Sequence, residues 1–242
     1  MWTYIIIGVS IAFVLLLCLC LAISSYSGEN FFNKLEENDK IRNSVGISTM
    51  DYVVSINTRY FGGKLKITRC LEGDDHYARG IVALSERTMC SNSLASLATV
   101  SHELGHARQD ASGDRLQKHW KLRRTGRICG MFFMPLVIVG VVLSLLYLFE
   151  TIESISALIA GIACVGAGIF IFFFAIFLKY REVKIEREAS DFGVEFLQEI
   201  LSPDEVKQCK EFLDSARLTY WAGLFKTLLG WTFLTKNDKM FR

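Results

Sequence analysis

The chain has 242 residues, of which 51% are hydrophobic and 21% are charged. This mixture is typical of a protein in which apolar membrane segments and a soluble part share one chain. The formal net charge is only +2, and no dense basic stripe with interleaved aromatic residues is present, so the composition gives no indication of nucleic-acid binding.

The first predicted element is a membrane-spanning helix over Thr3–Ile23. This run carries no charge and reaches the roughly 20 apolar residues that a helix needs to cross a bilayer. A cleaved signal peptide is the alternative, but no basic segment precedes the run, and it is longer than the apolar region of a signal peptide. We therefore predict a permanent transmembrane anchor over residues 1–24.

A soluble domain is predicted over residues 25–127. It begins with a polar helical stretch around residues 30–42, and two short strands follow at 64–70 and 78–85, with the turn-forming sequence GDDH between them. Residues 91–110 then read as one helix, with Asn92 or Ser93 placed to cap it. These elements predict a small α+β domain.

Two apolar runs, Ile128–Phe149 and Ile155–Leu178, are joined by a short acidic link. So short a link predicts an antiparallel transmembrane hairpin over residues 128–178. Lys and Arg crowd the open ends of this hairpin, whereas its tip carries Glu150 and Glu153. By the positive-inside rule the open ends, and with them both polar parts of the chain, face the cytoplasm.

The C-terminal region, residues 179–242, contains a last apolar run, Leu218–Leu234, that Lys226 interrupts. Its aromatic residues suit a membrane interface, so we predict an interfacial helix, with a fourth crossing as the alternative. Taken together, the elements predict a mainly α integral membrane protein that combines three transmembrane helices with a small α+β domain.

The seven cysteines show no spacing typical of a zinc ribbon or a redox motif. An odd number of cysteines without a framework predicts reduced thiols in a protein that faces the cytosol.

The segment His102–His106 reads HELGH, an instance of the H-E-x-x-H pattern, and it falls in the predicted helix 91–110. Residues four apart lie on one face of a helix, so both imidazoles can reach one zinc ion. Glu103 lies beside them, where its carboxylate can take a proton from a metal-bound water. Gly105 costs about 1 kcal/mol of helix propensity, which predicts a close packing partner at this position.

A catalytic zinc site normally has three protein ligands, so a third must come from elsewhere in the chain. The metzincin continuation would need Gly at position 109 and His at 112, but the chain has Gln109 and Ser112, which excludes that class. The hairpin returns the chain to the same membrane face, where five acidic residues are candidates: Glu182, Glu186, Glu188, Asp191 and Glu195. Spacing alone leaves the choice among them open.

Several further motifs accompany HELGH. They are DHY at 75–77, LS at 84–85, SLASLATVSHELGHARQ at 93–109, I-E-x-x-A-S at 185–190 and LTY at 218–220, distributed around three spans. With these motifs, most of the chain resembles the YugP family of membrane zinc metallopeptidases. The resemblance implies that His102, His106 and Glu186 bind the zinc ion and that Glu103 is the catalytic base.

The E-x-x-A arrangement is also similar to that of HtpX-type membrane proteases, in which an Asp usually occupies the position of Ser190. The polar partner of the histidines could be Ser190 or Asp191. Tyr77 and His76 are both candidates for an oxyanion donor. One of the two predicted strands could serve as the edge on which an extended substrate peptide lies.

The resemblance implies a zincin-like catalytic domain of gluzincin type in a multi-pass protein of a bacterial-type plasma membrane. The expected activity is endopeptidase cleavage of membrane or membrane-proximal proteins from the cytoplasmic side, and the expected partners are the lipid bilayer and a protein or peptide substrate. An inactive zinc-binding membrane scaffold is the alternative, although the intact HELGH argues against it. A transporter would be expected to carry charged residues inside its spans, and these spans have none.

Overall fold

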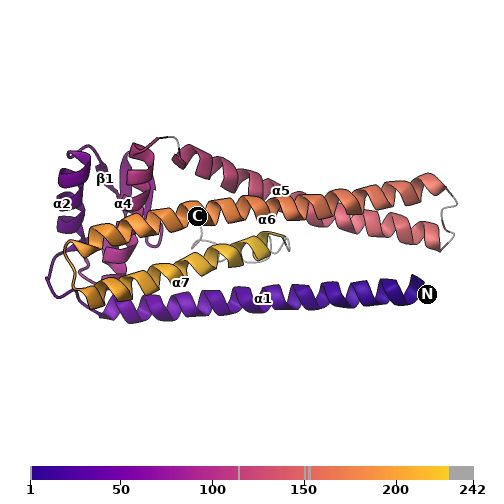
Figure 1. Ribbon diagram of the computed structural model, residues 1–242, viewed down its shortest axis with the longest axis horizontal. Coiled ribbons are helices and arrows are strands. Elements are labelled where there is room, and N and C mark those ends of the chain that lie inside the picture. The colour runs from indigo at the N-terminus through magenta and orange to yellow at the C-terminus, as the bar shows by residue number, and fades with distance from the viewer. Residues whose placement is uncertain (1, 114, 150, 152–153, 229–242) are drawn as a thin grey trace. The chain divides into compact units, whose positions relative to one another are not determined.

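The computed structural model describes residues 2–113, 115–149, 151 and 154–228 (Figure 1). The described part is mainly helical with one small sheet, as predicted. The helices are α1 (Trp2–Lys40), α2 (Thr49–Phe61), α3 (Glu86–Cys90), α4 (Leu94–Ala111), α5 (Arg115–Leu148), α6 (Ile155–Gln198) and α7 (Pro203–Leu228). The strands are β1 (Lys66–Arg69), β2 (His76–Ala78) and β3 (Ile81–Leu84).

The chain divides into two compact units. The first contains the residues up to Lys118 together with Val183–Ala222, so it holds the sheet, α4 and the last part of α6. The second contains His119–Glu182 and the stretch that begins at Gly223. The HELGH segment and Glu186 therefore lie in the same unit, although the whole hairpin, residues 128–178, separates them in sequence.

The sheet has the strand order β1-β3-β2, with β1 parallel and β2 antiparallel to β3. The sequence predicted a turn at 73–76 and a single strand over 78–85. A turn is present, with the N–H of Asp74 bonded to the carbonyl oxygen of Leu71 at 3.1 Å, but the single strand is wrong. The chain turns at Arg79 and Gly80, whose φ angles are +45° and +82°, and residues 76–78 form β2. Positive φ at both central residues is what a two-residue hairpin turn of type I′ requires, and glycine adopts it without strain.

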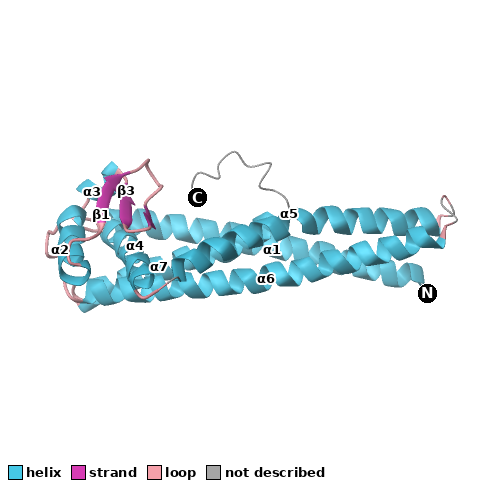
Figure 2. Cartoon of the chain, turned by 90° about the horizontal axis from the view of Figure 1, so that it is seen from above, coloured by secondary structure: helices cyan, strands magenta, loops and turns pink. Residues whose placement is uncertain are grey.

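The core of the first unit lies around α4. Helices α2 and α3 gather with α4 around the short strands (Figure 2). Tyr52 and Ile56 of α2, Leu97 of α4 and Phe196 of α6 are at most 1% exposed. Complete burial of one such side chain contributes roughly 1.5–3 kcal/mol to the free energy of unfolding. A tightly packed α4 holds the HELGH side chains in fixed positions.

In the same unit, α1 and α7 lie side by side (Figure 1), where the rings of Phe31 and Phe212 stack with centroids 5.7 Å apart. The predicted polar helix 30–42 is the end of α1 and is continuous with the helix that contains the predicted first span. Of the predicted interfacial run 218–234, residues up to 228 belong to α7, and the remainder lies outside the described residues.

In the second unit, α5 and α6 form the predicted antiparallel hairpin. The rings of Phe133 and Phe172 lie 5.1 Å apart, and a Cβ atom added to Gly140 would come within 2.6 Å of the carbonyl oxygen of Gly161. Small residues at such a crossing allow two helix backbones to approach closely, which is typical of helix packing in membranes.

Two helices in the described part of the chain are long and apolar enough to cross a membrane: Lys118–Leu148 and Ile155–Gln198. The sequence predicted three. The predicted first span lies within α1, but most of its side chains are outside the described residues, so it does not count among the two.

Candidate metal centre

The HELGH segment lies in the second half of α4. The Ser93 hydroxyl caps this helix by accepting a hydrogen bond from the backbone N–H of Ser96 at 3.2 Å. Of the two caps that the sequence allowed, Asn92 and Ser93, the structure therefore uses Ser93. His102 and His106 follow one turn apart, with ring centroids separated by 4.7 Å. The helix therefore presents both imidazoles on one face, as the spacing predicted.

Two glycines allow α6 to approach α4 closely. A Cβ atom added to Gly105 would lie 2.0 Å from the carbonyl oxygen of Ala189, and one added to Gly193 would lie 2.7 Å from that of Ser101. Side chains at these two positions would force the helix backbones apart. The close partner predicted for Gly105 is thus Ala189, and the crossing brings Glu186, one turn earlier on α6, to the histidines.

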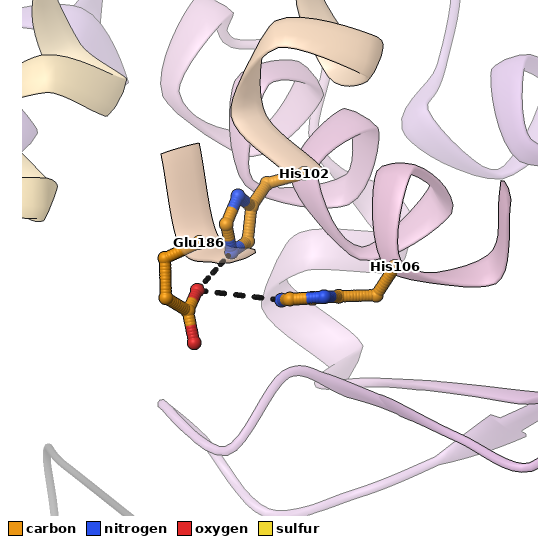
Figure 3. A group of neighbouring side chains, drawn as sticks. All are labelled: His102, His106 and Glu186. Atoms are coloured by element: carbon orange, nitrogen blue, oxygen red, sulfur yellow. Dashed lines mark ion pairs between the residues drawn. The ribbon is translucent and has the colours of Figure 1, made fainter. Parts of the chain in front are cut away.

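The carboxylate of Glu186 faces both imidazoles (Figure 3). Its Oε2 lies 3.2 Å from Nε2 of His102 and 3.4 Å from Nε2 of His106. The three donor atoms lie within 4.8 Å of one another, and the side chains are at most 13% exposed. Two imidazole nitrogens and one carboxylate oxygen form a donor set of catalytic zinc sites. These residues therefore fit a zinc ion, and their ligand roles stay a prediction.

Ser190 fixes the ring of His102. Its hydroxyl donates to the carbonyl oxygen of Glu186 at 3.1 Å, so it accepts from Nδ1–H of His102, which is 3.1 Å away. With its Nδ1–H held by Ser190, His102 offers Nε2, the nitrogen nearest Glu186, to a metal ion. Of the two partners that the sequence left open, Ser190 makes this contact, whereas Asp191 is exposed and pairs with Arg187 at 3.9 Å.

Gln109, to which the sequence assigned no role at the site, fixes the ring of His106. Its amide nitrogen donates to the carbonyl oxygen of Ile185 at 2.8 Å and to Glu188 at 3.1 Å. Its Oε1 therefore accepts from Nδ1–H of His106 at 3.0 Å, so that Nε2 is again the nitrogen offered to a metal ion. The sequence signal that could have predicted this contact is spacing, because Gln109 follows His106 by three residues on the same helix face.

The charge of Glu186 dominates the electrostatics of the site. Burial opposes ionisation, but the charge of His106 and hydrogen bonds from both histidines hold the pKa of Glu186 well below its usual range. Burial also opposes protonation of His106, yet the Glu186 carboxylate outweighs it and raises the pKa of His106 to about 9. A buried carboxylate that stays ionised favours a cation among the three donor atoms, and a divalent metal ion meets that demand.

Glu103 lies beside these donors and has a different partner. Its Oε2 accepts a hydrogen bond from the backbone N–H of Tyr77 at 2.7 Å. Desolvation raises the pKa of Glu103, while the charges of His102 and His106 oppose this rise. A carboxylate with a raised pKa accepts a proton more readily, which suits a general base.

The remaining acidic candidates have other partners. Glu182 contacts Lys179 at 2.9 Å, Glu188 contacts Gln109 at 3.1 Å, Asp191 contacts Arg187 at 3.9 Å and Glu195 contacts Arg108 at 2.5 Å. Among the five, Glu186 is the carboxylate that contacts both imidazoles of the HELGH segment.

The two candidates for an oxyanion donor are also engaged elsewhere. The Tyr77 hydroxyl donates to Asp110 at 2.8 Å and accepts from the backbone N–H of Gly80 at 2.8 Å. Nδ1 of His76 lies 2.6 Å from the carbonyl oxygen of Asp74. Because Asp110 takes the hydroxyl hydrogen of Tyr77, the geometry gives no support to an oxyanion role for this residue.

Comparison with known families agrees with this geometry. The family model described as "Putative neutral zinc metallopeptidase" matches residues 12–235, a range that includes both HELGH and the α6 segment with Glu186. No curated protein and no solved structure matches the chain. The matching family is the YugP-like one that the sequence motifs indicated, and the comparison shows no relation to HtpX-type proteases. The chain belongs to this neutral zinc metallopeptidase family.

Proposed function

We propose that this protein is a membrane-anchored zinc endopeptidase of gluzincin type, with zinc held by His102, His106 and Glu186. The observation that carries the proposal is the convergence of two imidazole nitrogens and one carboxylate oxygen within 4.8 Å of one another. The proposal includes the similarity in site layout to HtpX-type proteases that the E-x-x-A arrangement of Glu186 and Ala189 indicated, with Ser190 in place of their usual Asp.

Each residue around the zinc has one task. When bound, Zn²⁺ would act as a Lewis acid that polarises a peptide carbonyl and lowers the pKa of a water molecule. Glu103 takes the proton of the attacking water and passes it to the nitrogen of the leaving amine. Ser190 and Gln109 hold the two imidazoles in the tautomer that directs Nε2 at the ion.

The substrate is proposed to lie along β2. This strand is at one edge of the sheet and packs against α4. The N–H of Tyr77 bonds to Glu103, so it points away from β3, and in an antiparallel ladder the carbonyl of the same residue points the same way. The Tyr77 carbonyl oxygen would then accept a hydrogen bond from an extended peptide, with little demand on its sequence.

The membrane assignment rests on the hairpin and on α1. Within the most apolar windows of α5 and α6, only 17% and 22% of the residues are buried, unlike the core helix of a soluble protein. This exposed apolar surface suits lipid. We add Thr3–Ile23 in α1 as a third span, from its length and lack of charge. The catalytic part then faces the cytoplasm of a bacterial-type cell.

This topology predicts the result of cysteine labelling in intact cells. A membrane-impermeant maleimide should modify Ser154→Cys at the hairpin tip and should miss Ser112→Cys at the end of α4. The unsubstituted chain serves as the control for background labelling of the native cysteines. In permeabilised cells the reagent should reach and modify Ser112→Cys. Labelling of Ser112→Cys in intact cells would place the catalytic side outside.

Metal removal tests the proposed activity itself. Protein purified in detergent should contain about one zinc per chain, as a three-ligand site implies, and should hydrolyse an unfolded protein substrate. A chelator should abolish hydrolysis, and added zinc should restore it. Zinc binding without any hydrolysis would instead favour the inactive scaffold.

A further inference from the structure

One residue, Tyr77, joins strand β2 to helix α4 at two points. Its backbone N–H donates to Oε2 of Glu103 at 2.7 Å, and its hydroxyl donates to Asp110 at 2.8 Å. Glu103 and Asp110 are two turns apart on the same face of α4, with His106 between them. Tyr77 is only 5% exposed, and both bonds are partly buried.

The same hydroxyl also fixes the turn after β2. It accepts the N–H of Gly80 at 2.8 Å, in a turn where Arg79 has a φ of +45°. A residue other than glycine in this region is strained, so the turn depends on such contacts. The Tyr77 hydroxyl thus ties the turn, the strand and the helix together.

Strand β2 needs this anchor because it is short and lies at the sheet edge. It has three residues and, within the described part of the chain, pairs only with β3, through His76, Tyr77 and Ala78. Short edge elements with few partners open locally at little cost in free energy. Any such opening would withdraw the Tyr77 N–H from the carboxylate of Glu103.

We propose that Tyr77 is a positioning residue for the general base: its hydroxyl bond to Asp110 clamps β2 against α4, and the clamped backbone N–H orients the Glu103 carboxylate. The consequence for catalysis rests on the function proposed above. Misplacement of a catalytic group by about 1 Å can cost on the order of a hundredfold in rate.

Tyr77→Phe keeps the ring and removes the hydroxyl, and it tests the clamp in the full-length protein. We expect kcat on an unfolded substrate to fall by roughly ten- to a hundredfold without loss of zinc, and any rise in KM from a looser β2 to be smaller than the fall in kcat. Asp110→Ala should have the same effect, and the double variant should be no worse than either single one. Asp110→Asn keeps an acceptor for the hydroxyl and should retain kcat within about threefold.

Tyr52→Phe is the matched control. Tyr52 is 1% exposed, and its hydroxyl lies 2.7 Å from Oγ of Ser101, so this variant also loses a buried hydrogen bond on α4 but leaves β2 and Glu103 untouched. It should lower Tm by an amount similar to Tyr77→Phe and keep kcat. Equal losses of kcat in the two variants would reduce Tyr77 to a structural residue and overturn the proposal.

Residue-resolved hydrogen exchange gives a readout that does not depend on activity. The amide of residue 77 points away from β3 and is protected by Glu103, so both Tyr77→Phe and Glu103→Ala should speed its exchange by about tenfold or more. Unchanged exchange in Tyr77→Phe overturns the clamp whatever the activity. Hydrolysis that persists in Glu103→Gln overturns the proposed function instead, and the exchange result still decides the role of Tyr77.

Discussion

Glu103→Gln is expected to separate metal binding from turnover. The amide has the size of the carboxylate and its oxygen can still accept the Tyr77 N–H, so β2 and the three proposed zinc ligands stay in place. It cannot take a proton from water. Zinc measured by atomic emission should therefore remain near one per chain, while kcat falls by about two to four orders of magnitude.

Glu195→Gln is the control for this change. Glu195 lies on α6 in the same unit, is exposed and pairs with Arg108 at 2.5 Å, away from the three donor atoms. Exposed ion pairs contribute about 0–1 kcal/mol, so this variant should keep both zinc and activity. Full hydrolysis by Glu103→Gln would remove Glu103 from the mechanism and with it the proposed catalytic scheme.

Features that depend on neighbouring residues were predictable from the sequence. The four-residue spacing of His102 and His106 and a helix cap at Asn92 or Ser93 were predicted, and the structure has the spacing and places the cap at Ser93. The apolar runs with a short acidic link likewise predicted the antiparallel hairpin, because length and hydropathy need no knowledge of packing.

The third donor depended on a contact between distant segments. More than 75 residues separate His106 from Glu186, and spacing left five acidic residues open. What selects Glu186 in the structure is the crossing of Gly105 over Ala189, which sets the depth and register of α6 against α4. Before the structure, only the family resemblance identified Glu186 as the third donor. The role of Gln109 arises from the same crossing, because its partner Ile185 lies on α6.

The strands were the least predictable part. Residues 76–78 form β2 where the sequence predicted the end of a turn at His76 and the start of a strand at Ala78, because pairing with β3 and the bonds of Tyr77 extend the strand. The Arg79–Gly80 turn was read as part of one strand, since only the glycine signals positive φ and the arginine does not. Consequently the sequence did not identify the strand that holds Glu103.

Glu186→Ala is expected to remove metal and activity together. The site would be left with two imidazoles, and removal of the carboxylate also removes the negative charge that favours a cation there. Zinc affinity should fall by more than the roughly 10- to 100-fold that is typical when an outer partner of a ligand is lost. Zinc titration measures this, and far-UV circular dichroism should show an unchanged helix content.

The neighbour Glu188 provides the matched control for Glu186. Glu188 accepts from the amide nitrogen of Gln109 at 3.1 Å, but that amide also donates to the carbonyl oxygen of Ile185 at 2.8 Å, so Gln109 should keep its orientation in Glu188→Ala. Zinc affinity should then fall by no more than about tenfold. If Glu188→Ala loses its zinc while Glu186→Ala retains it, the third ligand lies two residues later on α6. If both variants retain zinc and full activity, the metal is bound elsewhere and the three-donor site is not the catalytic centre.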